Sequence, residues 1–340
     1  MINSEIIFPE GLKPGDRIAL ISPASAVKRE YVEGAMERIA QFGYKPELME
    51  FALGNQDGSF AASRDKRLRD LLKALEDPDI KAIFCNRGGY GCCQLMPYIP
   101  EAIIRENPKW IIGFSDISAL LAMWSFCGVA SVHGPMAKHL ATMPADDPCT
   151  LALFKLLENS GEFEYTVEGN PLNREGEAEG VLLGGNFAVL NGLIGSRYDI
   201  FNDASAGSPA CGDSGLHPSA HTGKGVILFI EDISEPIYKV NRMLWQLELS
   251  GGFKHVKGII FGQFTDYKPD ANYDSMESML DDFISTSQWL GAIPIAFNFP
   301  TGHVPFNLPL PVGATVTLSV APSSVTLSSA SAITSFPSQK

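Results

Sequence analysis

Ser115 occupies a position in the sequence where a serine hydroxyl could act as a nucleophile. It follows the apolar run 110–114 and precedes the helix-like segment 116–126, so the pattern predicts a strand, a tight turn and a helix. A serine on such a turn exposes its hydroxyl, and the first N–H groups of the helix can face a developing oxyanion. The position suits a helix N-cap equally well. The hydrolase pattern G-x-S-x-G is also incomplete, because Ile117 replaces the second glycine.

A hydroxyl nucleophile needs a base and a group that orients the base, and Glu231 and His303 are the candidates. Histidine has an ordinary pKa that suits proton transfer near neutral pH, and a carboxylate can orient its ring and stabilise its charged form. Glu231 follows the apolar run 225–230, and His303 follows Gly302. We expect both side chains to project into a shared cleft. His133 is the rival base, and each of these residues alone also fits a structural role at a strand end.

The segment 87–91, Arg-Gly-Gly-Tyr-Gly, follows another apolar run at 80–85. Consecutive glycines let backbone N–H groups approach a ligand closely, so this segment could complete an oxyanion hole or bind a carboxylate. Taken alone, it is more typical of an ordinary glycine turn. It lacks the G-x-x-x-x-G-K-[ST] phosphate loop, and we therefore predict no nucleotide site here. The six cysteines form no CxxC pair or Cys/His cluster with zinc spacing, which predicts reduced, mostly buried thiols and no zinc site.

The elements that must position these groups alternate between strands and helices in the first part of the chain. This alternation predicts an α/β fold, with a mostly parallel sheet, flanking helices and functional loops at the carboxyl ends of the strands. We expect strands at 17–22, 80–85 and 110–114, and helices at 30–42, 65–76 and 116–126.

The second part of the chain predicts a smaller C-terminal α/β domain. We expect an N-terminal domain over 1–150 that carries the nucleophile, an acidic linker over 151–178 and a C-terminal domain over 179–330 that carries Glu231 and His303. A Gly/Ser/Ala/Pro-rich surface loop is expected at 202–223 and a disordered tail at 331–340. The strands and the helix expected in the second domain are 225–230, 256–261, 314–320 and 324–327, with the helix at 240–249.

Composition excludes some classes of protein. A length of 340 residues favours two domains, and 26 basic against 39 acidic residues argue against a nucleic-acid partner, which would need a basic face. No stretch approaches the roughly 20 apolar residues that span a bilayer, and the first residues do not resemble a secretory signal. We therefore expect a cytoplasmic protein with no membrane partner.

Nine short motifs, in order between about residue 11 and residue 320, resemble the serine LD-carboxypeptidase family. A run of nine in family order is far more specific than any one of them. The motifs are Leu12-Lys-Pro-Gly-Asp16, Ser22-Pro-Ala-Ser25, Arg87-Gly-Gly-Tyr-Gly91, Ile112-Gly-Phe-Ser-Asp-Ile-Ser118, His133-Gly-Pro-Met136, Leu183-Gly-Gly-Asn186, Phe229-Ile-Glu-Asp232, Ile237-Tyr-Lys-Val-Asn-Arg-Met-Leu244 and Gly302-His303.

The resemblance implies a role for five of the residues. Ser115 would be the nucleophile, His303 the general base and Glu231 its carboxylate partner, with an oxyanion hole from the N–H groups of Gly89 and Asp116. It also implies an active site between the two domains, a homodimer, and no metal or cofactor. The implied activity is removal of the terminal D-alanine from murein tetrapeptide, a small peptide, during cell-wall recycling. A related branch inactivates microcin-type peptide nucleotides.

Substrate recognition is less determined than mechanism. An acidic protein that accepts an acidic peptide needs local positive charge, for which Arg87 and Arg242 are candidates, and Asn186 is a third candidate substrate-binding residue. Family members often show G-E-P-P-Y where this chain has 234–238, Ser-Glu-Pro-Ile-Tyr, and the loop 202–223 could reshape the substrate mouth. The alternatives are a microcin-immunity peptidase, a non-catalytic muropeptide-binding module and a conventional α/β-hydrolase esterase, which shares the chain order Ser, Glu, His.

Overall fold

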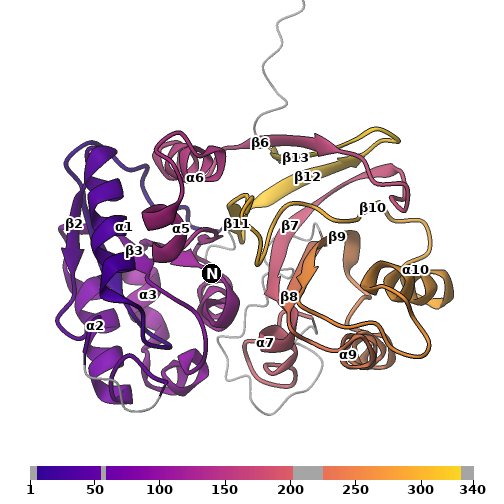
Figure 1. Cartoon of the computed structure of the whole chain (residues 1–340), viewed down its shortest axis with the longest axis horizontal. Coiled ribbons are helices and arrows are strands. Elements are labelled where there is room, and N and C mark those ends of the chain that lie inside the picture. Colours follow the sequence, from indigo (N-terminus) through magenta and orange to yellow (C-terminus); the bar gives the residue numbers. More distant parts are fainter. Residues whose placement is uncertain (1–5, 55–58, 202–224, 331–340) are drawn as a thin grey trace, which may run out of the picture.

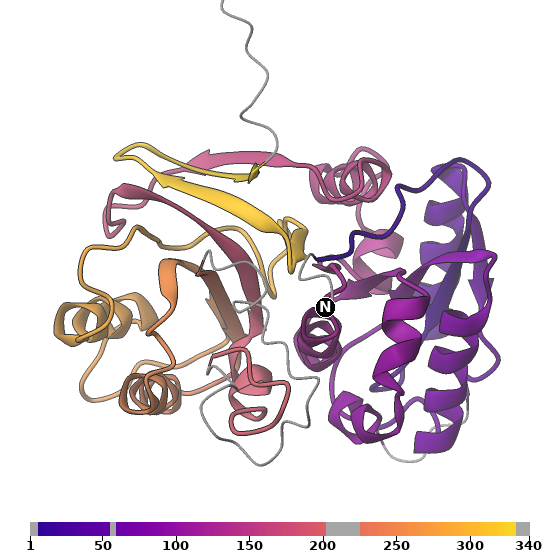
Figure 2. The same ribbon diagram turned by 180° about the vertical axis from the view of Figure 1, so that it is seen from behind.

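Two β-sheets with flanking helices form the protein (Figure 1). The computed structural model describes residues 6–54, 59–201 and 225–330. The predicted loop at 202–223 and the predicted tail at 331–340 lie outside the described residues. The first sheet belongs mainly to the N-terminal half of the chain and the second to the C-terminal half, as both views show (Figures 1 and 2). The mixed α/β architecture confirms the predicted fold class.

The first sheet has the strand order β11-β5-β4-β3-β1-β2, and all its neighbours are parallel except β11. The carboxyl ends of the parallel strands therefore meet at one edge, where the loops after β3 and β4 lie together. The apolar run 80–85 forms β3 without a change of bounds. The parallel strands are β1 (Arg17–Ile21), β2 (Lys45–Leu48), β3 (Ile80–Cys85), β4 (Trp110–Gly113) and β5 (Ser131–His133).

The helices of this half follow from the spacing of their apolar residues. In α1 the buried residues Val32, Ala35 and Ile39 form one stripe, which is the pattern of a helix that covers a sheet. Every residue of α4 is buried, which is typical of a helix enclosed on all sides. The helices are α1 (Arg29–Gln41), α2 (Arg64–Glu76), α3 (Glu101–Glu106), α4 (Ser118–Phe126), α5 (Ala137–Thr142) and α6 (Pro148–Glu158).

The second sheet has the strand order β10-β9-β8-β7-β12-β13-β6. Its half formed by β7 to β10 is parallel, whereas β12, β13 and β6 are antiparallel. Its strands are β6 (Glu164–Glu168), β7 (Gly176–Asn186), β8 (Val226–Ile233), β9 (Val256–Thr265), β10 (Ile295–Ala296), β12 (Thr315–Val320) and β13 (Ser324–Ser329). Its helices are α7 (Phe187–Asn191), α9 (Ile237–Ser250) and α10 (Met276–Thr286), with α9 and α10 on the side away from the first sheet (Figure 1).

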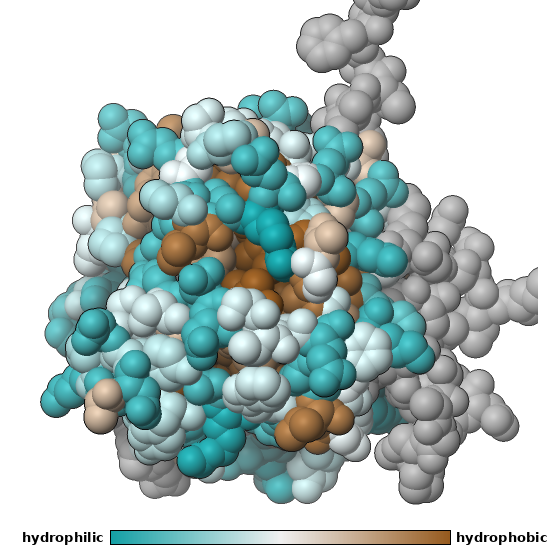
Figure 3. All heavy atoms as spheres, turned by 90° about the vertical axis from the view of Figure 1, so that its right-hand side faces the viewer, coloured by the Kyte–Doolittle hydropathy of each residue, from teal (hydrophilic) through white to brown (hydrophobic). Residues whose placement is uncertain are grey.

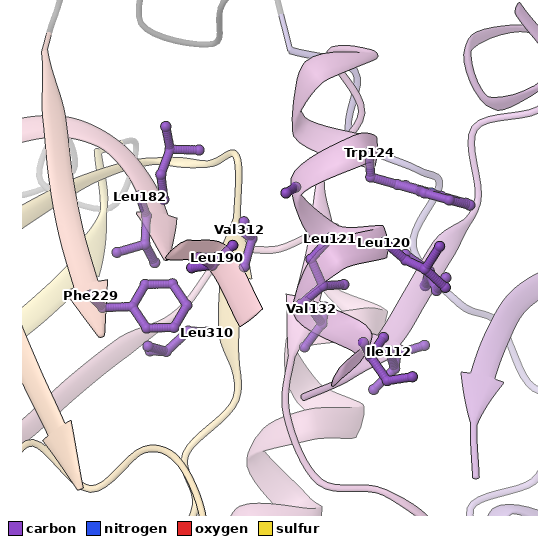
Figure 4. Packing of buried hydrophobic residues seen from close by; sticks show 14 of the residues in the cluster. Ile112, Leu120, Leu121, Trp124, Val132, Leu182, Leu190, Phe229, Leu310 and Val312 are labelled. Carbon is purple, nitrogen blue, oxygen red and sulfur yellow. The ribbon is translucent and has the colours of Figure 1, made fainter. Parts of the chain in front are cut away.

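One continuous hydrophobic core joins the two sheets. Figure 4 shows side chains of β4 and β5, such as Ile112 and Val132, on one side of it, and Phe229 of β8 on the other. The central helix α4 contributes Leu121 and Trp124, and it contacts both β5 and β7. Each large apolar side chain buried there stabilises the fold by about 1.5–3 kcal/mol. The relative placement of the two halves is therefore held by packing.

Strand β11 (Leu310–Val312) ties the C-terminal half of the chain to the first sheet. It pairs antiparallel with β5, so that Leu310 lies opposite His133. The sequence predicted no strand here, since three residues with a proline before them and another in the middle give no periodicity. This pairing anchors the segment after His303 beside the end of the sheet that carries Ser115.

Residues 151–178, predicted as a linker, instead hold most of α6 and the whole of β6. Helix α6 begins at the N-cap Asp147, whose side chain accepts a hydrogen bond from the Thr150 N–H. Strand β6 alternates exposed and half-buried residues at the edge of the second sheet. Such an edge strand needs no strongly apolar residues, which is why its sequence resembles a polar connection.

Three further features bear on the class of protein. No helix within the described ranges is long and apolar enough to cross a membrane. Hydrophilic side chains cover much of the end of the molecule that carries α10, around a smaller apolar area (Figure 3). Of the cysteines that the structure describes, all are free thiols and only Cys93 is exposed, as the cysteine spacing predicted.

Candidate active site

Ser115 lies on a sharp turn directly after β4. Its φ of 64° is a left-handed conformation that L-residues other than Asn and Asp adopt rarely. The turn continues as the short 3-10 helix Ser115–Ile117 and then becomes α4, so the predicted helix 116–126 is divided in two. A strained serine between a strand and a helix is the geometry of a nucleophile elbow, even though Ile117 replaces the second glycine of the motif.

The glycine loop after β3 lies against this turn. A Cβ on Gly88 would come within 2.7 Å of the Ser115 Cβ, so only glycine allows the loop to approach the serine so closely. Asp116 is almost fully buried, and its Oδ2 accepts a hydrogen bond of 2.9 Å from the Cys92 N–H. This bond fixes the glycine loop and the serine turn relative to each other.

Two backbone N–H groups beside Ser115 are free to bind an oxyanion. Among the residues that the structure describes, neither the Gly89 N–H nor the Asp116 N–H donates to a protein acceptor. Gly89 follows Gly88, which touches the serine, and Asp116 follows the serine itself. Free, preorganised N–H donors at such a place can stabilise the negative charge of a tetrahedral intermediate.

Glu231 and His303 form a hydrogen-bonded pair although they are 72 residues apart in the chain. The His303 Nδ1 and the Glu231 Oε2 are 2.7 Å apart, and Glu231 is completely buried at the carboxyl end of β8. Gly302 packs on the carboxylate with a φ of 118°, and a Cβ there would come within 2.7 Å of Oε2. Its N–H donates to Asn307 Oδ1, which holds the loop that carries the histidine.

Phe114 connects the two halves of the site. Its ring packs edge-on against the His303 imidazole, with 4.8 Å between ring centroids, and Ser115 is its neighbour in the chain. Ser115 and His303 both line one cavity of about 720 Å³, a volume typical of ligand sites. No hydrogen bond joins Ser115 Oγ to His303 within the described chain. Such bonds are often formed only when substrate is present.

His133, the rival base, lies in the interior of the protein. It is completely buried, does not line the cavity, and neither ring nitrogen has a hydrogen-bond partner among the described residues. Burial lowers its pKa to about 4, against the opposing effect of the Glu231 charge. Phe114 and Phe229 pack against its ring. An imidazole in this position stays neutral and cannot reach a substrate.

The three predicted substrate-binding residues lie in different places. Arg87 lines the cavity, and its guanidinium donates to the Ala26 carbonyl. Asn186 caps α7 by accepting from the Val189 N–H and donates to a carboxylate of β8, so its amide is already engaged inside the protein. Arg242 lies on α9, where it packs over the ring of Tyr238 and does not line the cavity.

Two lysines and a histidine that the sequence did not single out also line the cavity. Lys28 precedes α1, and Lys138 and His139 lie on α5. Among the residues that the structure describes, no aspartate or glutamate lines it, although the chain as a whole carries a net charge of −13. No pattern in the sequence indicates this grouping, because α1 and α5 pack together only in the folded protein. The cavity therefore favours an anionic ligand.

Comparison with protein families identifies the chain. Residues 18–134 match the LD-carboxypeptidase N-terminal domain, and residues 179–318 match the LD-carboxypeptidase C-terminal domain. The chain belongs to the LD-carboxypeptidase family. This membership confirms the resemblance drawn from the nine motifs.

Two relatives and one solved structure share nearly the whole length of the chain. The probable murein peptide carboxypeptidase of Bacillus subtilis is 31% identical and covers 92% of both chains. The murein tetrapeptide carboxypeptidase of Pseudomonas aeruginosa is also 31% identical, over 89% of this chain and 92% of its own. The crystal structure of muramoyltetrapeptide carboxypeptidase from Oxalobacter formigenes has a TM-score of 0.76 at 27% identity, and covers 92% of this chain and 98% of its own.

Proposed function

We propose that this protein is a serine LD-carboxypeptidase in which Ser115 is the nucleophile, His303 the general base and Glu231 the group that orients the base. The observation that carries the proposal is the buried Glu231–His303 hydrogen bond, with the imidazole in the same cavity as the strained serine. The bond from Nδ1 leaves Nε2 of His303 as the nitrogen that exchanges a proton with the substrate and the serine.

The reaction follows from these positions. His303 Nε2 takes the proton of Ser115 while Oγ attacks the peptide carbonyl, and the N–H groups of Gly89 and Asp116 bind the resulting oxyanion. Protonated His303 then gives its proton to the departing amine, and an acyl-enzyme remains. A water molecule, deprotonated by the same imidazole, releases the acid and restores the serine.

The substrate we propose is murein tetrapeptide, from which the C-terminal D-alanine is removed at an L-configured centre during peptidoglycan recycling. The names of the two relatives and of the solved structure support this choice. So does a cavity that is lined by Lys28, Arg87 and Lys138 and, within the described ranges, by no carboxylate. A nucleophile on a rigid turn must meet the carbonyl in line with the oxyanion donors, which makes the configuration of the leaving residue important. A misplacement of about 1 Å can cost on the order of 100-fold in rate.

The test offers three substrates to the pure protein: murein tetrapeptide ending in D-alanine, its L-alanine epimer and a peptidyl-adenylate. We expect release of alanine from the first only. Equal rates for the two epimers would contradict LD-carboxypeptidase activity and leave a serine hydrolase. Cleavage of the adenylate alone would favour the microcin-immunity branch. Binding of tetrapeptide without release of alanine would favour a non-catalytic module.

The same assay tests the proposed independence from metals and thiols. We expect turnover to survive a chelator and a thiol-blocking reagent, since the mechanism above uses only serine, histidine and glutamate. Recovery of a chelator-treated enzyme on addition of zinc would contradict this mechanism.

A cytoplasmic location and a homodimer belong to the same proposal. The resemblance to the LD-carboxypeptidase family supports both, because that family acts on recycled cell-wall peptides and forms homodimers. Light scattering on the protein as it elutes from a sizing column should give twice the chain mass of 36.8 kDa. A value equal to the chain mass would contradict the homodimer.

A further inference from the structure

One part of the cavity lining comes from the short helix α5, which contributes Lys138, His139 and Thr142, and from its C-cap Met143. Residues at this spacing lie on one side of a helix. Ser115 and the glycine loop line the same cavity. A peptide whose carbonyl lies at Ser115 must therefore place some of its other groups against α5.

His139 is held in a fixed orientation by a second buried carboxylate. Its Nε2 lies 2.8 Å from Asp147 Oδ2, and the same oxygen accepts from both the N–H and the Oγ1 of Thr150, each at 2.8 Å. Burial opposes ionisation of Asp147, yet these hydrogen bonds hold its pKa below the ordinary value. Because the carboxylate is ionised, Nε2 of His139 carries the proton that it donates. Nδ1 is then the free nitrogen of the ring, and it can bind a carboxylate only as a donor, when it also carries a proton.

Lys138 carries a free positive charge beside this histidine. Within the described part of the chain, its ammonium makes no hydrogen bond or ion pair with protein. Of the other cations of the cavity, Lys28 lies 3.4 Å from Glu30, and Arg87 uses one guanidinium donor for the Ala26 carbonyl. A lysine that has no protein partner among the described residues, in a cavity that none of their acidic side chains lines, can bind an anion without first breaking an ion pair.

We propose that Lys138, with His139 beside it, forms a subsite for a carboxylate of the peptide substrate. This inference rests on the proposed function and deepens it, because it says which part of the cavity binds a charged group of the substrate. The carboxylate has two possible sources: the C-terminus of the leaving amino acid, or a carboxylate earlier in the peptide. Asp147 acts as a positioning residue, which orients His139 and does not touch the ligand.

The experiment measures equilibrium binding to the Ser115→Ala protein by calorimetry, so it does not depend on turnover. The ligands are murein tetrapeptide, the same peptide with its C-terminus amidated, and the same peptide with its earlier carboxylates amidated. We expect one amide to bind about 10- to 100-fold more weakly than the acid, as for the loss of a charged hydrogen bond. The amide whose binding is weakened shows which carboxylate of the peptide the subsite binds.

A second substitution assigns that loss to Lys138. In Ser115→Ala/Lys138→Gln the acid should bind as weakly as the sensitive amide, and the amide should be unaffected by the substitution. Lys138→Arg should keep most of the affinity. Lys155→Gln, on an exposed position of α6, is the matched control and should change nothing. The inference is wrong if no peptide binds, or if the unamidated peptide and its amides bind equally well. It is also wrong if Lys138→Gln weakens the binding of all three peptides to the same degree.

Alanine release by the unmutated enzyme separates this inference from the proposed function. Release together with equal binding of acid and amides would refute the subsite and keep the activity. Absence of release together with Lys138-dependent preference for the acid would refute the activity and keep the subsite. Asp147→Ser retains an N-cap oxygen for α6 but removes the charge behind His139. This variant should weaken the binding of the unamidated peptide by only a few-fold.

Discussion

Two histidines line the same cavity, each is paired with a buried carboxylate behind it, and the two pairs differ in what surrounds them. His303 and Glu231 are 2.7 Å apart, and His139 and Asp147 are 2.8 Å apart. In the first pair Nδ1 is held and Nε2 is left free, whereas in the second pair Nε2 is held and Nδ1 is left free. The first imidazole packs on Phe114, the neighbour of the strained Ser115, and the second lies on α5 beside a free lysine.

The two carboxylates also differ in their hydrogen-bond partners. Asp147 Oδ2 accepts three hydrogen bonds and caps a helix, so its position has a structural use of its own. Glu231 is completely buried, its Oε1 has no partner among the described residues, and the His303 ring is its hydrogen-bond donor. A short distance between a histidine and a carboxylate therefore does not by itself identify a general base. A general base is identified by a nucleophile that lies beside its imidazole.

The largest expected effect tests whether Ser115 and His303 act as a unit. Ser115→Ala and His303→Ala should each lower turnover by on the order of 10⁴- to 10⁶-fold, because either change removes covalent catalysis. The double variant should be no worse than either single variant. Measured release of alanine decides this, and a double variant far slower than both would show that the two residues act independently.

Glu231→Gln should come next, with a loss of up to about 10⁴-fold near neutral pH. An amide at this position can donate to Nδ1, which places the imidazole in the wrong tautomer, and it cannot stabilise the charged ring. KM should change little because the substrate does not touch this buried residue. A loss that appears mainly in KM would place Glu231 in substrate binding instead.

His133, a third histidine that also packs against Phe114, should affect stability and its pH dependence. Burial lowers its pKa to about 4 from 6.5, so between these values the unfolded chain binds a proton that the folded protein does not. The free energy of unfolding should therefore fall as the pH drops from about 6.5 to about 4, by about 3 kcal/mol in total from this group. Urea unfolding at several pH values measures this.

His133→Phe removes the titrating group and keeps a ring between Phe114 and Phe229. The variant should lose less stability than the unmutated protein over the same pH interval. Equal slopes for the two proteins would show that His133 is not the group responsible.

The smallest expected effect on the kinetics comes from His139 of the His139–Asp147 pair, and it tests how this pair differs from His303 and Glu231. His139→Gln should leave kcat within a few-fold of the unmutated enzyme and raise KM by about 10-fold or less, because this side chain touches the ligand but exchanges no proton with it. Steady-state kinetics with murein tetrapeptide measures both constants. A loss in kcat comparable to that of His303→Ala would give His139 a part in the chemistry.

Local sequence predicted the fold well where periodicity was strong. The run 80–85 is β3 with the same bounds, and α2 begins only one residue before its predicted start at 65. The prediction failed at 151–178, where β6 is an edge strand and α6 depends on a cap at Asp147. Buried strands need apolar side chains on both faces, and edge strands do not, so only the former are distinct in the sequence.

In the candidate site, too, some features were predictable from local sequence and others were not. The turn at Ser115 and the glycine loop at 87–91 were predicted because each follows a strand within a few residues, and adjacent parallel strands bring their ends together. Glu231 and His303 were named from residue type and from the family resemblance. Their contact was not predictable from spacing, since 72 residues separate them. The placement of Arg242 and Asn186 away from the cavity was equally invisible in the sequence.

By itself, the sequence determined the α/β fold, the strand–turn–helix setting of Ser115 and the family, because these depend on local periodicity and on short motifs. Only the tertiary structure decided which histidine meets which carboxylate, that His133 is buried and that Lys138 has a free charge beside the cavity. The physical reason is that such contacts depend on how α4 and β11 pack the two sheets together, and long-range packing leaves no mark in the spacing of the residues it joins.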